Sequence, residues 1–313
     1  MIIITGGAGF IGSNLISSLN KNRIKEIIIF DNLDKLKKKN LKNLSFKKIY
    51  FKSEIFEFLK FNKKKIDGVF HLGACTNTLE NNWDYLYKNN FEFSKRLAIH
   101  CGLNNIKFIY ASSASVYGKK SGDFDELKKM KLLKPLNLYA KSKLIFDKFI
   151  IKNFSDNSKI IGLRYFNVYG INEDHKLNMA SPVHNFFYQI KQKKFCKIFD
   201  KFDGYPAGGH KRDFVSVDDC VKVNLWFFKK KKLQKNIFNV GSGSAITFKD
   251  VATTIKNELK YGEIKIIKFP TQLKKGYQSY TKANLNKLRS IGYSKKFTTI
   301  FQGIQNFIKK KNF

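Results

Sequence analysis

The sequence predicts an α/β fold built on a doubly wound parallel sheet. Short apolar segments of buried-strand length alternate with segments long enough for helices, a pattern typical of parallel sheets. The predicted strands are Ile2–Thr5, Ile27–Phe30, Val69–Leu72, Phe108–Ala111 and Ile160–Arg164. Between two of them, Phe93, Leu97 and Cys101 recur at helical spacing, and a glycine-rich turn follows the first strand.

The spacing becomes irregular and turn-rich after about residue 170, for example at 203–209. We therefore predict a Rossmann-type dinucleotide-binding domain over residues 1–170, with returning segments near 211–243. A smaller, partly interleaved substrate-binding domain is predicted over residues 171–313. In open α/β sheets ligands bind at the carboxyl ends of the strands, so the site is expected there.

Length and composition favour a cytoplasmic globular protein. The 313 residues are 43% hydrophobic, which is enough for a sizeable core, and no apolar stretch reaches the roughly 20 residues that span a bilayer. The first strand leads directly into a glycine turn, without the features of a signal peptide. Four scattered cysteines without a C-x-x-C pair predict reduced thiols and no metal site.

The formal net charge of +36 raises the question of nucleic-acid binding. The lysines are spread along the chain rather than gathered in one motif, so we expect no specific nucleic-acid partner and no membrane partner. A basic scaffold that binds a dinucleotide or RNA is the non-enzymatic alternative.

A dinucleotide-binding loop is predicted at the turn after the first strand. Gly7, Gly9 and Gly12 match the pattern G-x-G-x-x-G, and Gly6 precedes them. The loop is placed between a strand and a helix, as this motif requires. Residues without side chains permit a tight turn and let a pyrophosphate approach the backbone N–H groups at the helix start.

The choice between NAD and NADP is open from these residues alone. Asp31 ends the second strand, where an acid binds ribose hydroxyls and favours NAD. Asn32 and the lysines that follow could reverse this preference by binding a 2′-phosphate, or could simply form a solvated charged surface.

A catalytic set is predicted from three residues. Tyr139 and Lys143 form Y-x-x-x-K, which places them on one face of a helix. A nearby ammonium is expected to lower the pKa of the phenol, which makes proton exchange with a substrate hydroxyl feasible. Ser113 follows an apolar strand and is expected beside Tyr139, where it can bind the reacting oxygen.

These elements are the hallmark of the extended short-chain dehydrogenase/reductase superfamily. Over essentially its whole length the chain resembles the ADP-L-glycero-D-manno-heptose 6-epimerases within it. The segments that carry the resemblance are residues 1–14, 71–76, 164–170, 175–181, 211–215 and 276–278. Among them, the H-K-x-x-M-A-S pattern from His175 is the most specific.

The resemblance implies NADP as a tightly bound cofactor and assigns residues to it. Beyond the loop glycines these are Phe10, Ile11, Asp31, Asn32, Lys38, Lys52, Leu72, Gly73, Ala74, Cys75, Thr76, Asn89, Lys143, Val168 and Lys176. The implied substrate contacts are Ser113, Asn167, Asn178, Phe199, Asp200, Lys201, Phe202, Arg212 and Tyr277, together with either His184 or Asn185.

The resemblance also implies a reaction, in which C6 of an ADP-heptose is oxidised and reduced again on the opposite face. Tyr139 and Lys176 would be the two acid/base groups of an isomerase that supplies heptose for the lipopolysaccharide core. A homo-oligomer, a pentamer in this family, is expected. The alternative is another nucleotide-sugar epimerase, such as a UDP-glucose 4-epimerase. A 4,6-dehydratase is disfavoured because residues 113–115 contain no acid.

Overall fold

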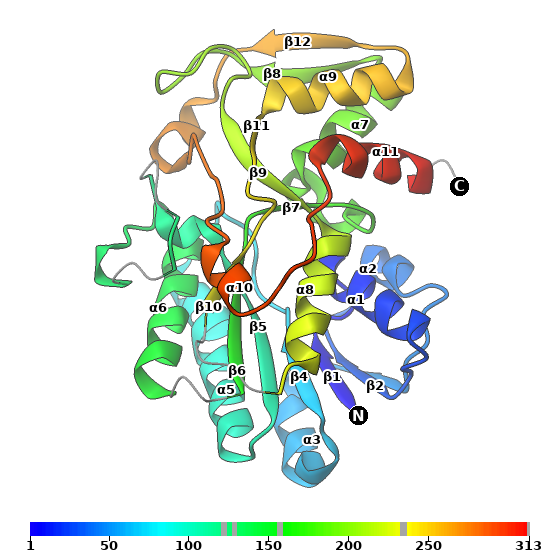
Figure 1. The fold of residues 1–313 in the computed structure, drawn as a ribbon, viewed down its shortest axis with the longest axis vertical. Helices are drawn as coiled ribbons and strands as arrows, with labels where there is room; N and C mark the ends of the chain where they lie inside the picture. Colours follow the sequence, from blue (N-terminus) through cyan, green and yellow to red (C-terminus); the bar gives the residue numbers. More distant parts are fainter. Residues whose placement is uncertain (120–123, 127–129, 155–158, 232–236, 312–313) are drawn as a thin grey trace. The chain divides into compact units, whose positions relative to one another are not determined.

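The computed structural model describes residues 1–119, 124–126, 130–154, 159–231 and 237–311, coloured along the chain in Figure 1. The chain divides into two compact units. The first comprises Met1–Ser113, Asn137–Arg164 and Val221–Phe238, and the second comprises Ala114–Leu136, Tyr165–Cys220 and Asn239–Phe313. Each unit is therefore assembled from three separate segments.

A seven-stranded sheet forms the framework of the first unit. Its strand order is β3-β2-β1-β4-β5-β6-β10, and the four pairings from β3 to β5 are parallel. The strands are β1 (Ile2–Thr5), β2 (Ile27–Phe30), β3 (Lys48–Tyr50), β4 (Gly68–His71), β5 (Lys107–Ser113), β6 (Ile160–Tyr165) and β10 (Ile237–Val240). This order changes direction between β1 and β4, as in dinucleotide-binding folds, and the predicted doubly wound sheet is confirmed.

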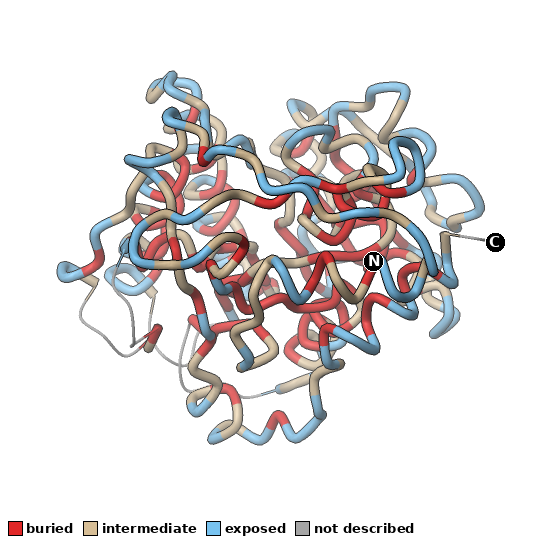
Figure 2. The backbone as a smooth tube through the Cα atoms, turned by 90° about the horizontal axis from the view of Figure 1, so that it is seen from above, coloured by how far each residue is buried: buried red, intermediate tan, exposed pale blue. Residues whose placement is uncertain are grey.

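Helices cover both faces of this sheet. On one face, α3 (Ile55–Asn62), α5 (Phe93–Leu103) and α6 (Leu138–Asn153) share a core with alternate strand residues such as Ile3 and Phe108. On the other face, Phe228 of α8 (Val217–Lys229) packs against Phe70, with ring centroids 5.2 Å apart. Burial on both faces makes the central strands mostly apolar, and every residue of β1, β2 and β4 is buried. Figure 2 colours the backbone by burial, with buried positions in red and exposed positions in pale blue.

The second unit contains two small sheets and its own core. One sheet has the order β11-β9-β7 and the other pairs β12 with β8 in parallel. The core joins apolar residues of α7, α9 and α11, including Phe187, Ile255 and Ile304. The elements are β7 (Asn167–Tyr169), α7 (Pro182–Lys193), β8 (Phe195–Phe199), β9 (Lys211–Ser216), β11 (Ala245–Thr247), α9 (Phe248–Leu259), β12 (Glu263–Ile267) and α11 (Ile300–Lys311).

The helix α1 (Phe10–Lys21) follows the first strand, and α2 (Lys35–Asn40), α4 (Trp83–Leu86) and α10 (Asn286–Ser290) are short. Two further segments matter for the site, the π-helical turn η3 (Tyr87–Glu92) and the 3₁₀ segment η6 (Asp174–Met179). None of the helices in the described parts of the chain has the length and apolar character that crossing a bilayer requires.

Candidate active site

The glycine-rich loop joins β1 to α1 and has the shape expected for binding a pyrophosphate. Gly6 has a φ of +70°, and a Cβ there would overlap the backbone of Gly73. A Cβ on Gly12 would overlap the Gly6 carbonyl oxygen. The N-cap of α1 is Gly9, which has no side chain to occupy the helix N-terminus. The first backbone N–H groups of α1 can therefore bind an anion.

Asp31 lies at the end of β2 and is held by three donors. Its Oδ2 accepts the Ala8 N–H at 3.0 Å, and its Oδ1 accepts the Asn32 N–H at 2.8 Å. The ammonium of Lys37, from α2, lies 2.9 Å from the same Oδ1. Asp31 thus anchors the glycine-rich loop, and a neighbouring cation offsets its charge. Lys38, the lysine implied by the resemblance, is exposed on the same helix.

The segment after β4 contains the next group of predicted cofactor residues, from Leu72 to Thr76. Gly73 lies against Gly6 of the first loop, so the two loops meet where the strand order reverses. Cys75 is fixed by Asn90, whose side chain bonds to its N–H at 2.9 Å and its carbonyl at 3.0 Å. The Asn90 amide also donates to the Ser142 hydroxyl at 3.0 Å. Sequence reasoning missed Asn90, which ties the loop after β4 to α6.

A π-helical turn between α4 and α5 carries Asn89, which the sequence predicted as a cofactor residue. Asn89 accepts a hydrogen bond of 2.8 Å from the ammonium of Lys52. Burial lowers the pKa of Lys52, while the charge of Asp31 raises it. π-turns interrupt regular helix geometry and often occur at functional sites. Here the turn places Asn89 and Asn90 toward two different partners.

The structure brings together the three predicted catalytic residues of the first unit. Ser113 ends β5, while Tyr139 and Lys143 lie one turn apart on α6. The side chains of Ser113 and Tyr139 are hydrogen bonded. The Lys143 ammonium donates to the Ala111 carbonyl at 2.9 Å. Asn137 caps α6 by accepting the Ala140 N–H, which fixes where this helix begins.

The expected lowering of the Tyr139 pKa is wrong for the protein without ligands. Burial raises the pKa of Tyr139 to about 12, and the Ser113 hydrogen bond only partly opposes it. Burial also lowers the pKa of Lys143 to about 8, against the raising effect of Asp147. The sequence showed two groups that could exchange protons but could not show that both are removed from water.

In the second unit, Arg212 and Tyr277 form a pair. Arg212, on β9, is 6% exposed, and its guanidinium lies 4.8 Å from the centre of the Tyr277 ring. Burial lowers the pKa of Arg212, while the Tyr277 phenol, with which it is hydrogen bonded, raises it. A buried guanidinium of this kind can donate two hydrogen bonds to a phosphate.

The predicted stretch from Phe199 to Phe202 follows β8 beside an aromatic cluster. Phe202 stacks on Phe269 with centroids 4.1 Å apart, and its carbonyl oxygen lies 3.0 Å from Nε2 of His210. Asp200 accepts the backbone N–H of Lys201 at 2.7 Å. His210 is a member of this cluster that sequence reasoning missed.

Four further predicted residues lie on β7 and η6. Asn167 and Val168 are half-buried on β7, and Asn167 lies within 3.4 Å of the Thr281 hydroxyl. Lys176 lies on η6 with its ammonium 3.6 Å from the carboxylate of Glu173. Asn178 is exposed on the same segment.

His184 and Asn185, the two alternatives for one substrate contact, lie side by side in the first turn of α7. His184 bonds through Nε2 to Asp174 at 2.9 Å, and its buried Nδ1 has no hydrogen-bond partner among the described residues. Asn185 donates to the Ala180 carbonyl at 3.0 Å. Both remain predictions.

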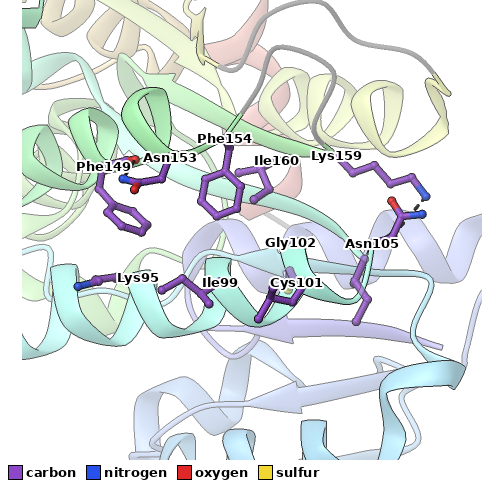
Figure 3. A pocket seen from close by; sticks show the side chains of 12 residues that line it. Lys95, Ile99, Cys101, Gly102, Asn105, Phe149, Asn153, Phe154, Lys159 and Ile160 are labelled. Atoms are coloured by element: carbon purple, nitrogen blue, oxygen red, sulfur yellow. Dashed lines mark hydrogen bonds between the residues drawn. The ribbon is translucent and has the colours of Figure 1, made fainter.

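A cavity of about 670 Å³ lies elsewhere in the first unit, between α5 and the end of α6 (Figure 3). Ile99 and Cys101 of α5 line it, together with Phe149 and Phe154. Lys159, which donates to the Asn105 carbonyl at 3.2 Å, closes one end. None of the predicted catalytic or binding residues lines this cavity, so it is not the candidate active site.

Comparison with known proteins decides the family. Residues 2–241 match the model of the NAD dependent epimerase/dehydratase family. The chain belongs to this epimerase/dehydratase family. It is 41% identical to an ADP-L-glycero-D-manno-heptose-6-epimerase from Brachyspira hyodysenteriae, over 98% of this chain and 96% of the relative. The match confirms the prediction that the chain is an epimerase.

Solved structures of other epimerases are similar to this epimerase and support its assignment to the family. The ADP-L-glycero-D-manno-heptose-6-epimerase of Helicobacter pylori matches with a TM-score of 0.84 and 27% identity, over 99% of this chain and 96% of that one. The UDP-glucuronic acid 4-epimerase of Bacillus cereus, solved with NAD, matches with a TM-score of 0.81 and 25% identity, over 99% of both chains. The glycine-rich loop and Asp31 of the epimerase described here fit a nicotinamide dinucleotide.

Proposed function

We propose that this epimerase interconverts ADP-D-glycero- and ADP-L-glycero-D-manno-heptose by transient oxidation at C6. The observation that carries the proposal is the hydrogen bond between Ser113 and Tyr139, with Lys143 one turn away on α6. It occurs in a chain that is 41% identical, over 98% of its length, to an ADP-heptose epimerase.

The cofactor we propose is NADP. Lys37 already offsets the charge of Asp31 and Lys38 is exposed on the same short helix, so this surface favours an added phosphate rather than repelling it. Phe10, Ile11 and Gly12 at the start of α1, and the segment from Leu72 to Thr76, would hold the dinucleotide. When bound, the oxidised nicotinamide supplies a hydride acceptor and a positive charge.

Tyr139 is the group proposed to take the proton from the C6 hydroxyl. Its high pKa in the protein alone means that the phenol needs added positive charge nearby before it can act as a base at neutral pH. Lys143 supplies part of that charge from one helical turn away, and Ser113 donates a hydrogen bond to the reacting oxygen.

Lys176 is the second acid/base group. Inversion requires the C6 ketone to turn, which presents its oxygen to a different proton donor. As hydride returns to C6, the Lys176 ammonium gives a proton to that oxygen. The epimerase then holds a phenol and a neutral amine, and proton exchange with water restores the starting state.

The second unit supplies the groups proposed to bind the substrate. Arg212 suits a diphosphate oxygen, and Tyr277 orients its guanidinium. His184 is favoured over Asn185 as a sugar contact because its Nδ1 is buried with no partner among the described residues, whereas the Asn185 amide is bonded to Ala180. Asn167, Asn178 and residues 199–202 complete the proposed set.

We extend the proposal to the setting of the reaction. The epimerase would act in the cytoplasm as a homo-pentamer and supply heptose for the lipopolysaccharide core. Sedimentation of the purified protein tests the pentamer, and a dimer or monomer would contradict it.

An isotope experiment tests the chemistry. The reaction is run in D₂O and the product is analysed by NMR and mass spectrometry. Because the hydrogen removed from C6 is carried as hydride and returned, the product should contain no deuterium at C6. Deuterium at C6 would instead show exchange of a C–H proton with solvent and would overturn the proposed oxidation.

A further inference from the structure

A fully buried carboxylate lies beside the proposed second acid/base group. Glu173, immediately before η6, is 0% exposed. It accepts the Gly170 N–H at 3.0 Å and the Ser181 N–H at 2.7 Å, and the Ser181 hydroxyl donates to it at 2.7 Å. A buried charge is costly unless it is paired and hydrogen bonded. These three hydrogen bonds offset the cost of burying the Glu173 carboxylate.

The contacts of Glu173 close a loop. Gly170 and Ser181 flank residues 171–180, so a single side chain ties together both ends of the segment that carries Lys176. The backbone of Lys176 also donates to the Glu173 carbonyl at 2.8 Å. Within the segment, Leu177 has a φ of +48°, a conformation that non-glycine residues rarely adopt. The loop therefore holds a disfavoured backbone conformation next to Lys176.

The same carboxylate forms an ion pair with Lys176. Its Oε2 lies 3.6 Å from the Lys176 ammonium, whose side chain is 23% exposed. The ion pair therefore restrains the side chain as well as the loop that carries it.

Other charged and titratable groups surround this pair. Asp174 is paired with His184 of α7 at 2.9 Å and with Lys311 of α11 at 3.1 Å, so its charge is already balanced. His175, half-buried, precedes Lys176 in the chain. The loop therefore contains two carboxylates with separate partners, and Glu173 is the one paired with Lys176.

We infer that Glu173 is a positioning residue, which fixes the loop that carries Lys176 and holds its ammonium in an ion pair. The inference rests on the proposed function, in which Lys176 donates a proton to the C6 oxygen. A buried carboxylate at 3.6 Å would hold the proton donor in place when the ketone has turned.

The test measures how firmly the ammonium of Lys176 is held without substrate. The protein is acylated briefly with acetic anhydride at one fixed pH, and the peptide that contains Lys176 is quantified by mass spectrometry. In Glu173→Gln the labelling of Lys176 should rise severalfold relative to the wild type, because the amine is released from its ion pair. Ser181→Ala removes a hydrogen bond of the loop but keeps the ion pair, and should leave the labelling of Lys176 unchanged.

The same variants are then assayed for turnover. In Glu173→Gln kcat should fall by roughly tenfold or more while KM changes little, because the misplaced group is a proton donor and not a binding group. Should Glu173→Gln fail to fold, Glu173→Asp retracts the carboxylate and should raise the labelling of Lys176 by a smaller factor. Unchanged labelling in both variants, even with a lower melting temperature, would reduce Glu173 to a structural role and overturn the inference. Failure of the wild type to epimerise ADP-heptose would instead overturn the proposed function, because the labelling needs no substrate.

Discussion

The ammonium of Lys37 lies 2.9 Å from Oδ1 of Asp31, at the end of the second strand of the sheet. An acid in this position ordinarily repels a 2′-phosphate, yet here it has a cationic partner from α2 and two backbone donors. In the proposal that the cofactor is NADP, Lys37 offsets the negative charge that would otherwise repel the 2′-phosphate.

Removing Lys37 should therefore change cofactor preference. We expect Lys37→Met to weaken NADP⁺ binding by roughly tenfold or more, the scale of one hydrogen bond to a charged group, and to leave NAD⁺ binding almost unchanged. The measurement is calorimetric titration of protein stripped of bound dinucleotide. Lys39→Met, on the exposed side of the same helix, is the matched control. Equal weakening of both cofactors would refute this role of Lys37.

Loss of either proposed acid/base group should slow the reaction without unfolding the protein. We expect Tyr139→Phe and Lys176→Met each to cut turnover by roughly 10²–10⁴-fold, the usual effect of removing a general acid or base. Steady-state rates and circular dichroism are measured together. Tyr261→Phe, a partly exposed tyrosine outside the proposed site, should retain full activity. Near-normal turnover in both Tyr139→Phe and Lys176→Met would rule out the two-base scheme.

The depressed pKa of Lys143 predicts a specific dependence of stability on pH. Its value of about 8 in the folded protein lies below the 10.5 of an exposed lysine, so the folded state releases this proton first. Between about pH 8 and 10.5 the unfolded state binds one more proton at Lys143 than the folded state does. The contribution of Lys143 to the free energy of unfolding therefore increases as the pH rises. Denaturant titrations of cofactor-free wild type and Lys143→Met should therefore differ progressively over this range. A constant difference would show that Lys143 titrates normally.

Asp147 should be the costliest carboxylate to neutralise in the first unit. It is 0% exposed and accepts hydrogen bonds from Arg164 at 2.8 Å, Ser112 at 2.9 Å and Tyr110 at 3.0 Å. Asp147→Asn removes the carboxylate that pairs with the buried guanidinium of Arg164, and the expected loss is about 3–5 kcal/mol in the free energy of unfolding. Lys47→Ala, which breaks an exposed ion pair with Glu26, should change stability little. A similarly small loss of unfolding free energy in Asp147→Asn and Lys47→Ala would contradict this role of Asp147.

The central strands could be predicted from the sequence because burial on both faces leaves a continuous apolar signal. Ile2–Thr5 and Ile27–Phe30 were predicted with their observed bounds, and the three other predicted strands differ at their ends by one or two residues. The strands β3 and β10 were missed. β3 is short and only partly buried, and the place of β10 at the sheet edge is set by long-range pairing rather than by local pattern.

The candidate site was predictable only where local motifs exist. The glycine loop and the Ser113, Tyr139 and Lys143 set have fixed spacing, and the structure brings the members of each together. Asn90 and Glu173 have no such signal, because their partners become neighbours only after folding. The raised pKa of Tyr139 was also beyond sequence reasoning, since desolvation depends on the packed structure.

The central claim is that this epimerase inverts C6 of an ADP-heptose. The direct measurement is to incubate the purified protein, carrying its dinucleotide, with ADP-D-glycero-D-manno-heptose and to follow the sugar by NMR. We predict appearance of the L-glycero epimer up to an equilibrium mixture, with no net consumption of cofactor. No conversion of this substrate, together with epimerisation of UDP-glucose at C4, would contradict the account.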